Sequence, residues 1–159
     1  MKEIEILGID IGGVITAGGN EMFTDNFLEV QAMPDCFEVI QRLVTERFGE
    51  RVYLVSKCGM RMQQKSVEWL CHHNFFDLTG VKSDHVEFCQ HRSGKAPICD
   101  RLGITHFIDD RLEVLGYLTS VSNIYLFRPK PSEVNRFSHH LPKVRQMNSW
   151  RDILKELVA

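Results

Sequence analysis

The chain has 159 residues, of which 43% are hydrophobic and 25% are charged, and its formal net charge is −2. This length fits one ordinary domain with a real core. The charged fraction and the near-neutral net charge do not point to a disordered tail or a strongly basic nucleic-acid-binding chain, and a local basic patch stays open. No apolar run approaches the roughly 18 residues of a membrane span, and no signal-length apolar segment follows the N-terminus. We therefore expect a single-domain cytoplasmic protein that makes no membrane contact.

The cysteines support the same location. They are five in number and include no C-x-x-C pair, at Cys36, Cys58, Cys71, Cys89 and Cys99. An odd number with this spacing argues against a disulfide framework and a zinc knuckle. Reduced thiols, as in cytosolic proteins, are expected.

Apolar runs of strand length alternate with segments of helical period along the chain. Strands are predicted at Ile4–Asp10, Val52–Ser56, Val86–Cys89, Thr105–Asp109 and Asn123–Phe127. Helices are predicted over residues 34–48, 60–72 and 97–102 and after Ser149, with a proline-containing loop at 128–143. This alternation predicts a three-layer α/β/α domain around a mostly parallel, five-stranded, Rossmann-like sheet.

Three of the predicted strands end in polar residues, namely Asp10, Ser56 and the pair Asp109-Asp110. Because ligands bind beyond the carboxyl ends of the strands in an open parallel sheet, we expect these side chains to converge. Buried carboxylates are costly without a cation, and an oxygen-only set suits Mg²⁺. Lys95, at a predicted loop-to-helix junction, and the backbone N–H groups of the glycine turn after Asp10 are candidates to neutralise a phosphate.

The order of these residues resembles the haloacid dehalogenase-like (HAD) superfamily, which contains phosphatases, phosphotransferases and a few dehalogenases. Residues 9–15 (IDIGGVI) resemble its first motif, in which the leading Asp, here Asp10, is the nucleophile. Residues 54–56 (LVS) resemble the second motif, whose hydroxyl holds the transferring phosphoryl group. Lys95 resembles the third motif, and residues 107–110 (FIDD) resemble the fourth, which supplies metal carboxylates.

The resemblance implies a Mg²⁺-dependent phosphohydrolase that acts through an aspartyl phosphate. The implied catalytic residues are Asp10, Ser56 and Lys95. The implied metal ligands are Asp10, the Gly12 carbonyl, Asp109 and Asp110. The implied phosphate-binding residues are Gly12, Gly13, Ser56, Lys57 and Lys95. From their positions in the sequence, Lys57 and Arg111 flank the expected site and are candidates to bind substrate.

One position departs from the family's pattern. Most of its phosphatases carry a second Asp two residues after the nucleophile as general acid and base, and Gly12 stands there in this chain. Loss of positioned acid–base help costs roughly 10²–10⁴ in rate. Two hypotheses are therefore open, an active phosphohydrolase and a non-catalytic phosphate- or partner-binding module that keeps the fold. A dehalogenase would fit Gly12 but leaves the Asp pair and Lys95 without a role.

The spacing of the motifs leaves no room for a large cap insertion. Residues 16–33 suffice for a flap, and residues 57–94 are filled by one helix, one strand and their loops. We therefore expect residues 1–159 to form a single uncapped HAD-like core. An open site of this kind suits a bulky phosphorylated partner (a phosphoprotein, a nucleotide or a nucleic-acid end) or completion by another subunit of an oligomer.

Overall fold

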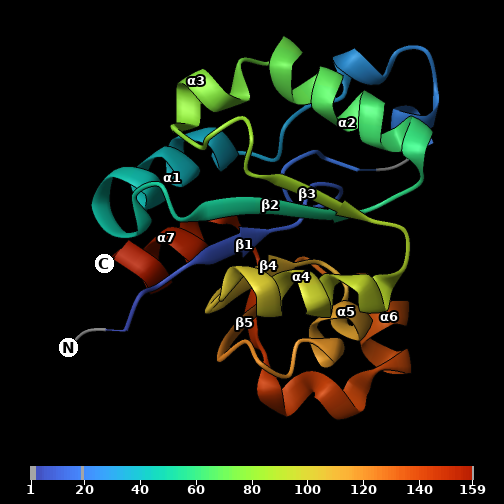
Figure 1. Cartoon of the computed structure of the whole chain (residues 1–159). Helices are drawn as coiled ribbons and strands as arrows, with labels where there is room; N and C mark the ends of the chain where they lie inside the picture. Colours follow the sequence, from blue (N-terminus) through green and yellow to red (C-terminus); the bar gives the residue numbers. More distant parts are fainter. Residues whose placement is uncertain (1–2, 19, 159) are drawn as a thin grey trace.

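The computed structural model describes residues 3–18 and 20–158 (Figure 1). Its centre is a sheet with the strand order β3-β2-β1-β4-β5-β6, in which every pairing is parallel. The strands are β1 (Leu7–Ile9), β2 (Val52–Lys57), β3 (Val86–Cys89), β4 (His106–Asp109), β5 (Asn123–Phe127) and β6 (Arg145–Met147). Parallel strands need crossover connections, and the helices supply them.

The helices lie between the strands in the sequence. The α-helices are α1 (Cys36–Leu43), α2 (Met60–His72), α3 (Phe75–Thr79), α4 (Lys95–Leu102), α5 (Leu112–Tyr117), α6 (Pro131–Arg136) and α7 (Trp150–Val158). Shorter helical segments are η1 (Asn20–Phe23), η2 (Phe27–Glu29), η3 (Val44–Phe48, a π-helical turn), η4 (Arg92–Gly94) and η5 (Ser138–Lys143). Within residues 3–18 and 20–158, no helix is long and apolar enough to span a membrane.

Both faces of the sheet are covered, because successive side chains of a strand point to opposite faces. In β5, Tyr125 and Phe127 belong to the core shared with α1 and α7, whereas Ile124 and Leu126 belong to the core shared with α4 and α5. Figure 1 shows α1, α2, α3 and α7 on one side of the sheet and α4, α5 and α6 on the other. The three-layer α/β/α prediction is confirmed.

The predicted strand number is wrong, because the sheet has six strands rather than five. The additional strand, β6, pairs with β5 in the register Phe127↔Met147. Arg145 and Gln146 are exposed on this edge strand, so it has no apolar run for the sequence to reveal.

The stretch at 128–143, predicted as a loop, contains α6 and η5. Pro131, one reason for predicting a loop, is the first residue of α6, where its missing N–H is harmless.

Several other boundaries agree with the sequence. The predicted bounds of α2, β3 and β5 are those observed. The last helix begins directly after Ser149, as the sequence predicts, and the Ser149 hydroxyl caps it by accepting a 3.1 Å hydrogen bond from the N–H of Asp152. α4 differs, since it begins at Lys95, two residues before the predicted start at Pro97. Lys95 therefore lies in a helical first turn, and this placement helps to build the site.

Candidate active site

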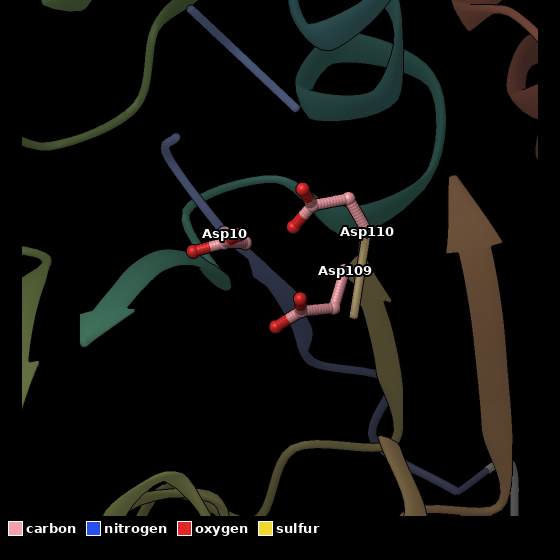
Figure 2. Close-up of side chains that lie close together, drawn as sticks. All are labelled: Asp10, Asp109 and Asp110. Atoms are coloured by element: carbon pink, nitrogen blue, oxygen red, sulfur yellow. The ribbon is translucent and has the colours of Figure 1, made fainter. Parts of the chain in front are cut away.

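The centre of the site is set by two neighbouring strands, β1 and β4. Ile9 of β1 is in register with Ile108 of β4, and the N–H of Asp10 donates to the Ile108 carbonyl at 3.0 Å. Asp10 and Asp109 are therefore brought to the same edge of the sheet, with Asp110 immediately after. Figure 2 shows the three side chains close together at the ends of these strands. Each offers an oxygen atom within 4.8 Å of the others, as the strand ends predict.

Lys95 joins two of these carboxylates. Its Nζ lies 2.9 Å from Asp10 Oδ1 and 2.7 Å from Asp109 Oδ2, and the side chain is 2% exposed. The other oxygen of Asp109 accepts a 2.9 Å hydrogen bond from the N–H of Arg111. Burial alone would lower the pKa of Lys95, but the charges of Asp10 and Asp109 and the hydrogen bonds to them raise it above its ordinary value. Lys95 is therefore a permanent cation in the site.

The remaining charge fits a divalent cation. Burial, followed by the charge of Asp10, raises the pKa of Asp109 to about 6 against the effect of Lys95. Burial and the charges of Asp10 and Asp109 raise the pKa of Asp110 to about 9. Three carboxylates against one ammonium leave two negative charges when all are ionised. Because every donor is a carboxylate oxygen, the set suits a hard divalent cation such as Mg²⁺.

The glycine turn after Asp10 brings the backbone close to Asp110. Gly13 has φ +80°, and its N–H donates to the carbonyl of Thr16 at 3.1 Å. This N–H is therefore used within the turn, whereas the sequence predicts that it contacts phosphate. A Cβ at Gly13 would lie 2.4 Å from Asp110 Oδ2, so only glycine permits the present position of that carboxylate.

Gly12 differs from its neighbour. A Cβ built there has no atom within 4 Å, and the residue lines the cavity above the carboxylates. The backbone N–H of Gly12 makes no hydrogen bond within the described parts of the chain. Space for a side chain is thus present at the position where the family's second Asp stands.

The carboxylates lie at a cavity of about 850 Å³, a volume within the ~300–1,000 Å³ typical of small-molecule sites. Asp10, Asp110 and Lys95 line it, together with two residues at the end of β2, Ser56 and Lys57. Ser56 is buried and Lys57 is exposed. Of the predicted site residues only Asp109 is withdrawn from the cavity, because it is fully buried beneath the others.

One part of the cavity lining comes from the flap, whose described residues are 16–18 and 20–33. Met22, Phe23 and Met33 give this part an apolar character. The flap is fastened to α2, since Lys65 Nζ donates to the Met22 carbonyl at 3.2 Å and Trp69 Nε1 donates to the Val30 carbonyl at 3.0 Å. The flap thus narrows a site that the sequence predicts to be open.

The flap also contributes a buried hydroxyl. Thr16 lines the cavity and is 1% exposed, and its Oγ1 has no hydrogen-bond partner within residues 3–18 and 20–158. An unsatisfied buried hydroxyl is unusual and is commonly satisfied by bound water or ligand. The Thr16 hydroxyl is thus available to hydrogen-bond a ligand or water beside the turn that follows Asp10.

Another part of the cavity lining, the cationic wall, carries positive side chains, and sequence reasoning missed most of it. Arg92, Arg128 and Lys130 line the cavity together with Arg111, the only one of the four singled out from the sequence. Arg128 directly follows β5, in the same relation to its strand as Asp110 to β4. Searching every strand end for charged residues of either sign would have found it.

Comparisons with known proteins support the fold. No protein-family model matches the chain, and no curated protein matches it by sequence. Among solved structures it is similar to a protein described as a haloacid dehalogenase-like hydrolase from Burkholderia xenovorans, with 14% identity over 86% of this chain and 63% of that one and a TM-score of 0.60. A dehalogenase solved as an intermediate complex gives 18% identity over 84% and 60%, with a TM-score of 0.60.

A third similar structure is a phosphatase. The cobalt-bound deoxy-D-mannose-octulosonate 8-phosphate phosphatase from Haemophilus influenzae is 14% identical over 97% of this chain and 86% of that one, with a TM-score of 0.60. The chain spans only about three fifths of the length of the first two proteins. At these identities the likeness is one of fold. The chain therefore has the α/β fold of the haloacid dehalogenase-like hydrolases.

Proposed function

We propose that this protein is a Mg²⁺-dependent phosphohydrolase of the HAD-like superfamily that acts through an aspartyl phosphate on Asp10. The observation that carries the proposal is the buried cluster at one edge of the sheet, in which Lys95 holds Asp10 and Asp109 while Asp110 lies within metal-ligand reach of both. An ion pair that only stabilised the core would not need a third carboxylate at the same point, since unpaired buried charge is destabilising.

The proposed metal ligands are Asp10, Asp109, Asp110 and the carbonyl of Gly12. When bound, Mg²⁺ screens the negative charge of the carboxylates and of the phosphoryl group. Lys95 supplies a second positive charge and keeps one Asp10 oxygen oriented by its 2.9 Å contact. Positioning and electrostatic stabilisation account for most of the catalysis of phosphoryl transfer.

In the first step an Asp10 oxygen forms a bond to phosphorus while the ester P–O bond breaks, and the leaving alkoxide takes a proton from solvent. Ser56 and Lys95 hold the non-bridging oxygens of the phosphoryl group. In the second step water attacks phosphorus and the bond to Asp10 breaks, which releases inorganic phosphate and restores the carboxylate. Without a carboxyl group at Gly12, both proton transfers depend on solvent or on the substrate itself.

The second candidate function is a phosphate- or partner-binding module without turnover. Gly12 favours it, because neither proton transfer has a positioned side chain at that position. The same cluster would then bind a metal and a phosphorylated ligand without hydrolysing it.

We also propose an uncapped core. Its support is that the described residues of the flap, 16–18 and 20–33, contain only the short segments η1 and η2, and that α2, α3, β3 and η4 lie within residues 58–94. The phosphorylated partner (phosphoprotein, nucleotide or nucleic-acid end), completion of the site by another subunit, and the cytoplasmic location stay predictions from the sequence.

The decisive experiment measures phosphate release from 4-nitrophenyl phosphate and a panel of nucleotides, with Mg²⁺ and with a chelator. We expect Mg²⁺-dependent turnover that falls by at least about 10³-fold in Asp10→Asn, as for other catalytic nucleophiles. Asp84→Asn, an exposed carboxylate before β3, is the matched control and keeps the activity of the parent. Mg²⁺ binding without turnover on any substrate would favour the binding module, and full activity of Asp10→Asn would refute the mechanism.

A further inference from the structure

The cationic wall of the cavity consists of Arg92, Arg111, Arg128 and Lys130. Arg92 is already paired, since its Nη1 lies 2.8 Å from Glu113 Oε1. Within residues 3–18 and 20–158, the side chains of Arg111, Arg128 and Lys130 make no ion pair or hydrogen bond with protein groups. Three positive charges therefore face the same cavity without protein partners.

The same wall contains one acidic residue, Glu133, which also lines the cavity. Its Oε1 accepts a 3.2 Å hydrogen bond from the N–H of Glu113 at the start of α5, so this carboxylate has a structural contact of its own. One carboxylate does not balance three cations, and the wall remains positive.

The backbone of Arg128 adds an independent observation. Arg128 has φ +41°, in the left-handed region that residues with a Cβ rarely adopt, and its N–H donates to the Met147 carbonyl at 3.0 Å. Strained residues of this kind cluster at ligand sites, where the surrounding structure holds them in place. Arg128 also lines a neighbouring, more open cavity of about 750 Å³, so it lies at the border between the two.

Lys95 and a bound divalent cation together balance the three carboxylates, so a phosphoryl dianion at Asp10 needs two further positive charges. Lys57 at the end of β2 and one group of the cationic wall supply them. The wall therefore has more positive charge than one phosphate requires, even with Glu133 counted against it. Arginine binds carboxylates and phosphates through paired, charge-assisted hydrogen bonds.

We propose, building on the proposed function, that the substrate is a small phosphate ester that carries a second anionic group, a carboxylate or a phosphate, bound by Arg111, Arg128 and Lys130. The phosphoryl group to be transferred lies at Asp10, and the second anion lies at the wall beyond β4 and β5. The cavity of about 850 Å³, which flap residues and this wall both line, has room for a molecule of metabolite size.

The test compares esters that differ only in the second anion. The first pair is 2-phosphoglycerate and glycerol 2-phosphate, which differ by a carboxylate. The second pair is adenosine 3′,5′-bisphosphate and adenosine 5′-monophosphate, which differ by a phosphate. In at least one pair we expect kcat/KM of the doubly anionic ester to be higher by at least about tenfold, the value of one charge-assisted hydrogen bond. The pair that shows this ratio identifies the second group as carboxylate or phosphate.

The variant Arg128→Gln/Lys130→Gln should bring this ratio to within about twofold of one, because neutral side chains lose the charge-assisted contact. The matched control, Arg42→Gln/Lys155→Gln, removes the same charge from exposed positions on α1 and α7 outside the cavity and keeps the ratio of the parent. Turnover with equal kcat/KM within both pairs would overturn the inference and leave the proposed function intact.

Absence of turnover on every ester would instead refute the proposed function. In that case the affinities of the four compounds test whether the wall binds a second anionic group. Isothermal titration with the same four compounds should show at least about tenfold tighter binding of one doubly anionic ester, lost in Arg128→Gln/Lys130→Gln. Equal affinities within each pair would overturn the inference. Preference for a phosphopeptide or a nucleic-acid end over all four compounds would also overturn it in favour of a larger partner.

Discussion

The missing side chain of Gly13 makes room for the carboxylate of Asp110, since a Cβ at Gly13 would lie 2.4 Å from Asp110 Oδ2. Replacement by alanine must displace that carboxylate and also strain a backbone with φ +80°. We expect Gly13→Ala to weaken Mg²⁺ affinity by at least about tenfold and to destabilise the fold by about 1 kcal/mol. Calorimetric Mg²⁺ titration and urea unfolding measure the two effects.

Gly12→Ala is the matched control for this prediction. A Cβ at Gly12 meets no atom within 4 Å, and its φ is outside the left-handed region. The substitution should therefore leave Mg²⁺ affinity within about twofold of the parent, since an open site adds neither clash nor strain. Equal losses in Gly12→Ala and Gly13→Ala would mean that the Gly13–Asp110 contact has no special role.

The open space at Gly12 also permits the missing acid–base group to be restored. We expect Gly12→Asp to raise kcat for alkyl phosphates by at least about tenfold, because a positioned acid contributes 10²–10⁴ in favourable cases. Aryl phosphates, whose leaving groups need little protonation, should gain less. Steady-state rates with glycerol 2-phosphate and 4-nitrophenyl phosphate give the comparison.

Gly12→Asn has nearly the same shape as Gly12→Asp but no transferable proton, so it separates chemistry from packing. A gain in kcat that appears equally in both variants would contradict an acid–base origin. A gain in neither variant would mean that the Gly12 position does not limit turnover, and would favour the binding module.

The sequence predicts the central part of this fold because the central strands are apolar. The runs at Val52–Lys57 and Asn123–Phe127 are mostly buried, so their hydrophobicity alone distinguishes them from the polar segments around them. Hydrophobicity does not identify β6, because this strand lies at the edge of the sheet and exposes Arg145 and Gln146. Its place is determined by pairing with β5, a contact distant in sequence that no local pattern encodes.

The candidate site, like the fold, is predictable from the sequence only in part. The convergence of Asp10 and Asp109 follows from the parallel topology, since adjacent strands end at one edge. The bridge from Lys95 to both carboxylates depends on the exact start of α4, and helix boundaries are poorly fixed by sequence. Arg128 and Lys130 were passed over because isolated arginines and lysines are ordinary surface residues. Only the cavity shows that they line the same site as Asp10 and Asp110.

Lys95 is expected to stabilise the fold as well as the site. It is almost fully buried between Asp10 and Asp109, and removal of one partner from a buried ion pair leaves uncompensated charge. We expect Lys95→Met to lower the free energy of unfolding by about 3 kcal/mol at pH 7 without divalent ions. Urea unfolding measures this loss, with the exposed Lys155→Met as control.

Mg²⁺ should offset part of this loss. Removal of Lys95 leaves Asp10 and Asp109 without their ammonium partner beside Asp110, so a divalent cation has more negative charge to balance. Saturating Mg²⁺ is therefore expected to raise the urea midpoint more in Lys95→Met than in the parent. If Lys95→Met cost less than about 1 kcal/mol, the ion pair would be a minor element of the core.

The opposite end of the sheet contains a pH-sensitive group, His106, the first residue of β4. It is 4% exposed, and its Nε2 lies 3.5 Å from Arg47 Nη2 and 3.6 Å from Glu5 Oε2. Burial lowers the pKa of His106, and the charges of Arg47 and Arg145 lower it further against the opposing charge of Glu5. The folded protein thus favours the neutral imidazole.

The sign of the resulting pH dependence follows from proton linkage. Because the folded-state pKa of His106 lies below its unfolded value of 6.5, the unfolded chain binds more protons between the two values. The stabilisation is complete above pH 6.5 and is lost as the pH falls through the folded-state pKa. Glu5, whose pKa is lowered by its hydrogen bond to Arg47, adds a loss of the same sign below its ordinary value of 4.5.

The raised pKa values of Asp109 and Asp110 act in the opposite direction in this range, so the prediction concerns the difference between two proteins. As the pH falls from 7.5 to 5.5, we expect the urea midpoint of the parent to change less favourably than that of His106→Gln. The quantity compared is the slope against pH, so a constant destabilisation by the substitution does not affect the result. His72→Gln, at the exposed end of α2, is the control and keeps the slope of the parent. If His106→Gln and the parent had the same slope, the titrating group would lie elsewhere, because a glutamine side chain binds no proton in this range.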